Sequence, residues 1–333
     1  MLIREQLELR EQNTLSEYAA LSQNTRGRVK PENKCSVRTE FQRDRDRIIH
    51  CKSFRRLKHK TQVFLSPEGD HYRTRLTHTL EVAQIARTIA RALMLNEDLT
   101  EAVSLAHDLG HTPFGHAGER ALNSLYKNGF HHYEQSLRVV DVLEKDGQGL
   151  NLTYETRNGI LCHTCGKQAD TAEGRIVRIA DRIAYMNHDI DDAVRAGVIK
   201  SSDIPKDITE LIGNDTSSRI NSMVMSVIEN SECGNIKMSQ EIQYAFDKLH
   251  GFMFESVYSN EYAKHEEKKV PELIGLLYTY YLRHPDLLPD DLCFVAENEG
   301  IERAVCDHIS GMTDHYATEK FKELFVPDPW KIN

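Results

Sequence analysis

The fourteen residues from 106 to 119 constrain this chain more than any other stretch. They read Ala-His-Asp-Leu-Gly-His-Thr-Pro-Phe-Gly-His-Ala-Gly-Glu. The glycines and the proline end the preceding helix and force a tight loop. The adjacent His107 and Asp108 would be costly as core residues, because two polar groups would be buried together. Imidazole and carboxylate are ligands that divalent cations prefer, so the pair predicts a metal site.

Two helices are expected to bring histidines to this site. In the first, residues 77–95, the apolar residues recur at a 3-4-4 spacing that marks one helical face: Val82, Ile85, Ile89 and Leu93. His78 stands four residues before this face begins. In the next helix, which Asn96 is expected to cap, His107 follows Val103 by four residues. Both imidazoles therefore project from apolar faces that must meet in the core.

A third helix, residues 175–194, is expected to supply a second carboxylate. Its apolar residues form a continuous seam, and Asp181, Tyr185 and Asp189 step by four beside that seam. Taken singly, a carboxylate on such a helix is most often a solvated surface group. Beside the seam, Asp181 is predicted as the fourth ligand of the cation. Two imidazoles and two carboxylates suit four-coordinate zinc, or an octahedral Mn, Fe, Mg or Ni ion with open positions.

Composition limits the class of protein. The 333 residues are 40% hydrophobic and 28% charged, with a net charge of −9, which is typical of a globular chain and argues against a general nucleic-acid coat protein. No apolar run is long enough to span a membrane, and the charged N-terminus is not typical of a signal peptide. Seven scattered cysteines indicate a reducing compartment, so we expect a cytoplasmic location. The run 162–165, Cys-His-Thr-Cys, lacks a second cysteine pair and more often has no metal role.

Basic residues gather between Arg43 and Lys60, where eight lysines and arginines are offset by two aspartates. On an acidic protein, such a cluster favours a local anionic ligand, although a solvated helix face is an equal alternative. We also expect a short β-like run at 61–65, a loop at 161–174 and a boundary or mobile region at 200–235. Further helices are expected at 242–258, 270–281 and 301–324.

These residues carry a resemblance to a known family. His78, then His107-Asp108, then Asp181 resembles the signature of the HD superfamily of metal-dependent phosphohydrolases. The similarity is closer to the bacterial deoxyguanosinetriphosphate triphosphohydrolase-like proteins and extends over nearly the whole chain. It is carried by Phe54 to Val63, Arg75 to Thr79, His107 to His116, Ala180 to Tyr185 and Gly311 to Asp314.

The resemblance implies an all-α fold with minimal β structure. It implies an N-terminal arm and loop at 1–40, an HD phosphohydrolase core at 41–200 and a C-terminal helical region packed on that core at 201–333. It also implies hydrolysis of a deoxynucleoside triphosphate at the α-phosphate, giving the deoxynucleoside and tripolyphosphate. A divalent metal ion, such as manganese, magnesium or iron, would be held by His78, His107, Asp108 and Asp181.

The resemblance further assigns roles to the other motif residues. His116 and Glu119 would be the catalytic pair, His111 would lie by the phosphates, and His132 keeps a matching position near them. The arginines assigned to the phosphate region are Arg56, Arg75 and Arg182. Gln62 and Asp189 would hold the sugar 3′-hydroxyl, and Tyr185 would exclude a 2′-hydroxyl.

One departure and several alternatives accompany this interpretation. Tyr133 replaces a small amide that many relatives carry, which puts the local hydrogen bonding in doubt. The resemblance implies a homo-oligomer, since such relatives often have allosteric nucleotide sites at subunit contacts. The alternative enzymes are an HD-type 5′-nucleotidase and a phosphodiesterase, and the alternative from another class is a catalytically weak nucleotide sensor or single-strand DNA binder. Intact His116 and Glu119 argue against lost chemistry.

Overall fold

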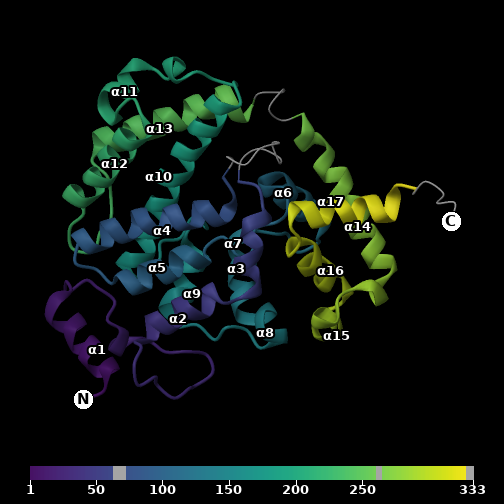
Figure 1. Cartoon of the computed structure of the whole chain (residues 1–333), viewed down its shortest axis with the longest axis horizontal. Helices are drawn as coiled ribbons and strands as arrows, with labels where there is room; N and C mark the ends of the chain where they lie inside the picture. The colour runs from purple at the N-terminus through teal and green to yellow at the C-terminus, as the bar shows by residue number, and fades with distance from the viewer. Residues whose placement is uncertain (63–72, 260–264, 328–333) are drawn as a thin grey trace, which may run out of the picture.

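The structure, a computed structural model, describes residues 1–62, 73–259 and 265–327 (Figure 1). It is all-α, as predicted: the described residues contain no strand, only isolated bridges such as that between Thr61 and Thr74. The helices are α1 (Ile3–Thr14), α2 (Glu40–Ile49), α3 (Lys52–Arg56), α4 (Arg75–Ala92), α5 (Glu97–Ala106), α6 (Gly115–Leu125), α7 (His132–Arg138), α8 (Glu144–Gly147), α9 (Tyr154–Cys162), α10 (Ala172–Arg195), α11 (Lys206–Ile212), α12 (Thr216–Asn230), α13 (Gln240–Met253), α14 (Val270–Arg283), α15 (Cys293–Glu299), α16 (Ile301–Ser310) and α17 (Asp314–Phe325).

Local sequence sets where the three central helices begin. Thr74, Asn96 and Thr171 cap α4, α5 and α10, and each side chain accepts a hydrogen bond from a backbone N–H in the first turn. The expected cap at Asn96 is therefore confirmed. A cap of this kind stabilises a helix by about 1 kcal/mol. These starts set the rotation of each helix and so the direction in which its polar residues point.

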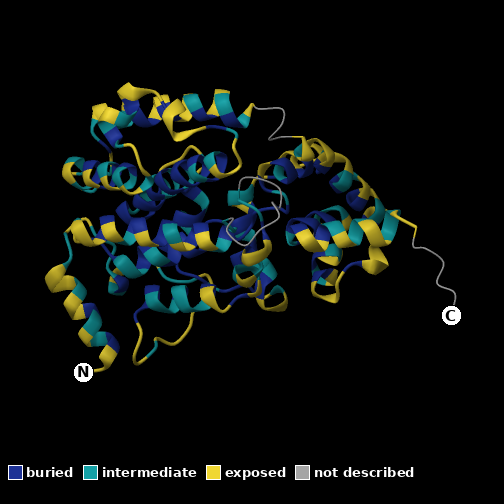
Figure 2. Cartoon of the chain, turned by 45° about the horizontal axis from the view of Figure 1, so that its top comes forward, coloured by how far each residue is buried: buried dark blue, intermediate teal, exposed yellow. Residues whose placement is uncertain are grey.

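The largest core lies between α4, α5 and α10 and continues over α11, α12 and α13. Val82, Ile89, Ile183 and Phe246 are among its fully or almost fully buried members. Figure 2 shows the buried residues on the sides of these helices that face one another. Each such side chain contributes roughly 1.5–3 kcal/mol on leaving water. The imidazoles of the site therefore lie at the end of a rigid apolar layer.

The stretch 200–235, expected to be a boundary or mobile region, is instead two packed helices. In α11, Ile208 and Ile212 are buried, and in α12, Met223 and Val227 are buried in the same core as α4. The polar composition misled the prediction because these short helices each bury only a narrow stripe. The division of the chain at residues 40 and 200 stays a prediction.

A second, smaller core joins the C-terminal helices to α6. Leu122 of α6 packs with residues of α14, α16 and α17, including Ile274 and Ile309. The single helix expected at 301–324 is wrong: α16 ends at Ser310, and Thr313 caps a new helix, α17. Gly311 lies in the turn between these two helices.

Two further predictions need correction or fall outside the described residues. The loop expected at 161–174 is shorter, because α9 runs to Cys162 and α10 begins at Ala172. Gly159 allows α9 to approach Val103 closely, since a Cβ there would lie 2.6 Å from a Val103 methyl group. Of the β-like run at 61–65, residues 63–65 lie outside the described residues.

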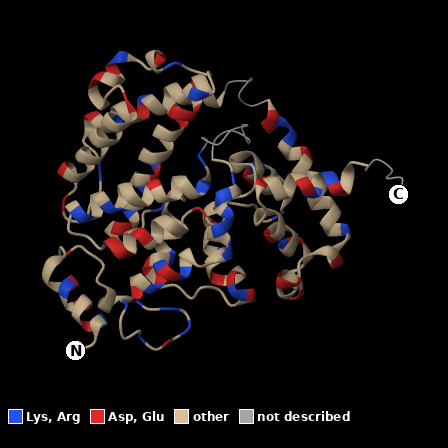
Figure 3. Cartoon of the chain, viewed as in Figure 1, with Lys and Arg blue, Asp and Glu red and all other residues tan. Residues whose placement is uncertain are grey.

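Half of the basic cluster is paired with acidic residues of the chain. Figure 3 shows basic and acidic residues side by side around α2. Arg43 and Arg47 pair with Glu32 at 2.7 and 2.5 Å, and Arg45 pairs with Asp98 at 3.0 Å. Lys52 pairs with Asp146 at 3.1 Å, so four of the eight basic residues are paired with carboxylates. The other four, Arg55, Arg56, Lys58 and Lys60, form no ion pair among the described residues. Separately, none of the helices in the described residues has the length and apolar character needed to cross a membrane.

Candidate metal centre and catalytic site

Four side chains from three helical segments converge at the C-terminal end of α5. His78 comes from the first turn of α4, His107 and Asp108 from the end of α5, and Asp181 from the middle of α10. Asp181 Oδ1 lies 3.1 Å from His78 Nε2 and 3.7 Å from His107 Nε2, and Asp108 Oδ1 lies 3.6 Å from His107 Nε2. The structure therefore brings together the four residues that the sequence predicted as ligands.

One atom shows that this cluster fits a cation. His107 Nδ1 lies 2.6 Å from the carbonyl oxygen of Ser104, so Nδ1 carries the proton and Nε2 presents a lone pair to the cluster. His107 is fully buried, and among the described residues its Nε2 has no hydrogen-bond partner. A buried polar atom without a partner costs roughly 1–3 kcal/mol. A divalent cation bound by the cluster would satisfy this atom.

The carboxylates have the charge that a cation requires. Although burial favours the neutral acid, His107 and Arg75 hold the pKa of Asp108 well below its ordinary value. Against the same effect of burial, the hydrogen bond from His78 lowers the pKa of Asp181 to about 2. Both groups are therefore ionised at neutral pH and suit a hard or borderline divalent ion.

A chain of hydrogen bonds lies beside the metal cluster. His116 Nδ1 lies 3.3 Å from Glu119 Oε2, and Glu119 Oε1 lies 2.9 Å from both the backbone nitrogen and Nδ1 of His132. Burial opposes ionisation, but the two histidines hold the pKa of Glu119 far below its ordinary value. Glu119 in turn raises the pKa of His132, against the effect of burial. His111 stacks on His132 at 4.5 Å, and burial keeps its pKa well below the ordinary value.

The loop that carries these groups is tightly held. Phe114 has a left-handed backbone conformation (φ 62°), and its N–H donates to Asp314, which also accepts the N–H of Thr61 at 2.9 Å. A Cβ on Gly118 would lie 2.0 Å from the carbonyl oxygen of Pro113. Gly118 is thus required by a close backbone approach, as is Gly110, where a Cβ would lie 2.1 Å from the backbone nitrogen of Ser136.

The cluster and the chain open on one cavity of about 460 Å³. This size is ordinary for a site that takes a small molecule. Ten of the predicted site residues line the cavity: Gln62, Arg75, His78, Asp108, His111, His116, His132, Asp181, Tyr185 and Asp189. His107 and Glu119 lie directly behind this wall. Arg75 is almost fully buried, and its Nη1 donates to Asp108 at 2.6 Å.

Two of the predicted arginines lie elsewhere. The guanidinium of Arg182 lies 4.6 Å over the ring of Phe246 and 3.5 Å from Asp247, both on α13. Arg56 donates to the carbonyl of Gly311 and lines a different cavity. The structure therefore brings only Arg75 of the three arginines to the catalytic cavity.

Several residues near the site were missed by the sequence analysis. The hydroxyl of Tyr258 donates to Asp189, and His250 and Phe254 line the same cavity wall. His163, from the Cys-His-Thr-Cys run, packs 5.1 Å from the ring of His107. The only sequence signal for it was a histidine in a short cysteine run, which is weak evidence.

A further missed pair lies beneath the metal cluster. His188 Nδ1 lies 3.3 Å from His78 Nδ1, and His188 Nε2 lies 2.6 Å from Glu81. Asp189 was predicted from the sequence as a site residue, but its neighbour His188 was missed. Adjacent residues on a helix point in different directions, so the spacing that marked Asp189 did not mark His188. The substituted Tyr133 stacks on His131 at 5.3 Å and makes no hydrogen bond among the described residues.

Two family models match the chain over the segments that form the site and the C-terminal helices. A family model described as the HD domain matches residues 75–186, and one described as the phosphohydrolase-associated domain matches residues 236–323. A deoxyguanosinetriphosphate triphosphohydrolase-like protein from Caldanaerobacter subterraneus is 58% identical, over 99% of this chain and 98% of its own length. Proteins of the same name from Desulfatibacillum aliphaticivorans (47% identical, 99% of each chain) and Clostridium perfringens (48% identical, 98% of each chain) are also similar.

Proposed function

Because this chain belongs to the deoxyguanosinetriphosphate triphosphohydrolase-like family and contains its HD domain, we propose that it hydrolyses deoxynucleoside triphosphates at the α-phosphate. The products would be the deoxynucleoside and tripolyphosphate. One observation carries the proposal: the His/Asp cluster and the chain of His132, Glu119 and His116 face the same cavity of about 460 Å³.

A divalent metal ion, held by His78, His107, Asp108 and Asp181, would supply positive charge that polarises a phosphoryl oxygen. Manganese, magnesium and iron all suit this ligand set. The remaining chemistry falls to the side chains of the chain itself.

His116 is the proposed proton donor. Hydrolysis forms a bond from a water oxygen to the α-phosphorus and breaks the bond to the 5′ oxygen, which must gain a proton. The side chain of His116 is 69% exposed to solvent and lines the cavity, and Glu119 lies at its Nδ1, so Nε2 would face the leaving oxygen. Glu119 is itself fixed by His132. This arrangement is that of a general acid with an orienting carboxylate, which contributes roughly 10²–10⁴-fold to a rate.

The other wall of the cavity is proposed to hold the substrate. Arg75 would bind the phosphates, because its Nε is buried without a partner among the described residues and a guanidinium suits a phosphate oxygen. Gln62 and Asp189 would bind the 3′-hydroxyl, and Tyr185 would exclude a ribose 2′-hydroxyl. Tyr258, bonded to Asp189, would fix that carboxyl group.

Product analysis tests the proposal. The purified chain, stripped of metal and reloaded with manganese, magnesium or iron, is incubated with each of the four deoxynucleoside triphosphates, alone and mixed. We expect tripolyphosphate and the deoxynucleoside by ion-exchange chromatography and ³¹P NMR. Orthophosphate or pyrophosphate as the sole inorganic product would favour a 5′-nucleotidase or phosphodiesterase, and binding without turnover would favour a nucleotide sensor.

A matched pair of variants assigns the chemistry to the site. His116→Ala should abolish most turnover, whereas His131→Ala, an exposed histidine outside the chain of hydrogen bonds, should leave it unchanged. A cytoplasmic location and a homo-oligomeric state, with or without a regulatory nucleotide, are further parts of the proposal. Light scattering with and without nucleotide measures the oligomeric state.

A further inference from the structure

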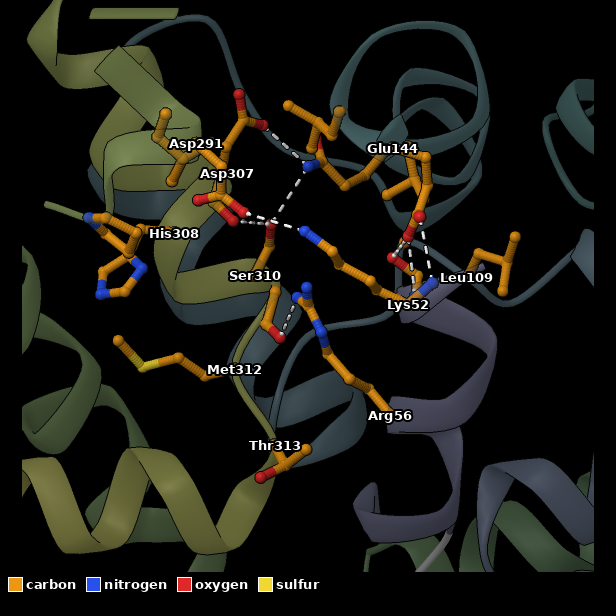
Figure 4. Close-up of a pocket in the computed structure, with 18 of the residues that line it drawn as sticks. Lys52, Arg56, Leu109, Glu144, Asp291, Asp307, His308, Ser310, Met312 and Thr313 are labelled. Carbon is orange, nitrogen blue, oxygen red and sulfur yellow. Dashed lines mark hydrogen bonds and ion pairs between the residues drawn. The ribbon is translucent and has the colours of Figure 1, made fainter. Parts of the chain in front are cut away.

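A second cavity, of about 380 Å³, lies between α3, α7 and the C-terminal helices (Figure 4). It shares no lining residue with the catalytic cavity. The residues that line this cavity belong to three segments of the chain, 52–60, 109–144 and 289–316.

Two cations in its wall have no counter-ion among the described residues. Lys60 is 2% exposed, and its Nζ donates to two backbone oxygens, those of His111 and Ser310. Arg56 donates one hydrogen bond, at 2.9 Å, to the carbonyl of Gly311. Neither side chain forms an ion pair within the described part of the chain. Burial, assisted by the nearby Arg56, lowers the pKa of Lys60 to about 7. A bound anion would relieve this cost.

The carboxylates of the same wall are already engaged. Asp307 accepts hydrogen bonds from Gln135 and from two arginines, Arg138 and Arg303. Glu144 accepts the backbone N–H groups of Lys52 and Ser53, at 3.0 and 2.7 Å. Asp291 lies 3.8 Å from Lys52 Nζ, across the cavity in Figure 4. The charge that remains without a partner in this cavity is therefore positive.

His308 supplies a third nitrogen donor to the wall of this cavity, besides Arg56 and Lys60. The ring of His308 packs edge-on against Tyr281 at 4.7 Å, and burial lowers its pKa to about 4, so it is neutral at pH 7. Its nitrogens have no hydrogen-bond partner among the described residues, and one of them carries a proton that it can donate. Gly311 permits this arrangement, since a Cβ there would lie 2.9 Å from Arg56 Nη1.

An apolar part of the wall is formed by Leu109, Val139, Leu143, Leu292 and Met312. We propose that this cavity is a binding site for a small molecule that carries a phosphate group and an apolar or planar body. The phosphate contacts Arg56, Lys60 and His308, and the body lies against the apolar wall. Its volume is sufficient for such a ligand.

Calorimetry on the metal-free protein tests this site, with adenosine 5′-monophosphate and inorganic phosphate as the probes. The two cavities are distinguished by a matched pair of arginine variants. Arg56→Gln should weaken binding of the monophosphate at least ten-fold, and Arg75→Gln, in the catalytic cavity, should change it less than two-fold. The monophosphate should bind at least ten-fold more tightly than phosphate, because only it contacts the apolar wall.

A second variant keeps the test decisive if Arg56→Gln does not fold. Gly311→Ala adds a methyl group that would lie 2.9 Å from Arg56 Nη1, so it should displace the guanidinium and also weaken binding, while circular dichroism reports the fold. Failure of both probes to bind at millimolar concentration would overturn the proposal. So would equal binding by the wild type and Arg56→Gln, loss of binding in Arg75→Gln alone, or equal affinity for the two probes.

Discussion

The Nδ1 atoms of His78 and His188 lie 3.3 Å apart beneath the metal cluster. Only one of them carries a proton. If His78 Nε2 is to bind a cation, its Nδ1 must donate to His188, and the other nitrogen of His188 then donates to Glu81 at 2.6 Å. Such outer partners fix the tautomer and orientation of a metal-binding imidazole.

His188→Leu should therefore weaken metal binding. The substitution leaves Nδ1–H of His78 buried without an acceptor, and we expect manganese affinity to fall by roughly 10- to 100-fold. Calorimetry measures this directly. His188→Gln, which can still accept a hydrogen bond, should recover part of the affinity, and His315→Leu, on the exposed face of α17, is the control. Unchanged affinity in His188→Leu would show that the pair does not orient His78.

Metal removal should lower the thermal stability of the protein. Binding to the folded state alone stabilises it by about 2.7 kcal/mol when the free ion is at 100 times its dissociation constant. Scanning calorimetry with a chelator and then with manganese measures the change in Tm. Asp181→Asn removes a charge from the cluster and should abolish most of the manganese-dependent rise. An equal rise in this variant would place the ion elsewhere.

Glu119→Gln should lower kcat more than it changes KM. The amide cannot hold both His116 and His132 as the carboxylate does, so the proton donor loses its orientation. We expect a loss of roughly 10²–10⁴-fold in kcat. Steady-state kinetics against the preferred triphosphate measures it. The control is Glu134→Gln, an exposed carboxylate on α7; an equal loss there would point to a general effect of charge.

Asp189 should make stability depend on pH. Burial raises its pKa to about 7, against the effect of the hydrogen bond from Tyr258. The unfolded state then loses this proton first, at about pH 4, so the contribution of Asp189 is fully present below that pH. This contribution to the free energy of unfolding is lost as the pH rises to about 7, by up to about 1.4 kcal/mol per pH unit.

The measurement for Asp189 is the free energy of unfolding in urea between pH 4 and 8. Asp189→Asn cannot ionise, so the difference between the variant and the wild type isolates this group from the histidines that titrate in the same range. We expect the variant to gain stability relative to the wild type as the pH rises. A difference that stays constant over the range would contradict the raised pKa.

Gly118→Ala should destabilise the catalytic loop. The added methyl group would lie 2.0 Å from the carbonyl oxygen of Pro113, so the backbone of the motif must move. We expect a loss of roughly 1–3 kcal/mol in the free energy of unfolding, with loss of activity. The control is Gly275→Ala in α14, where a Cβ meets nothing within 4 Å. Gly275→Ala should leave the free energy of unfolding unchanged or raise it by up to about 1 kcal/mol.

The sequence by itself determined the central helices and the convergence of the metal cluster. An apolar stripe with a period near 3.6 residues fixes which face of a helix is buried, and a capping residue fixes where it begins. For this reason His78, His107 and Asp181 could be placed on facing helices without coordinates. The resemblance to the family added the chemistry that is proposed for the loop at 106–119.

Tertiary structure alone decided which distant side chains meet. Arg56 and Arg182 point to other partners, and Tyr258 and His188 approach the site from faces that no pattern marked. The short helices at 206–230 and the second cavity depend on the same packing. Periodicity reports which side of a helix is buried, whereas the partner across the interface depends on helix crossing and rotamer, which the local sequence does not encode.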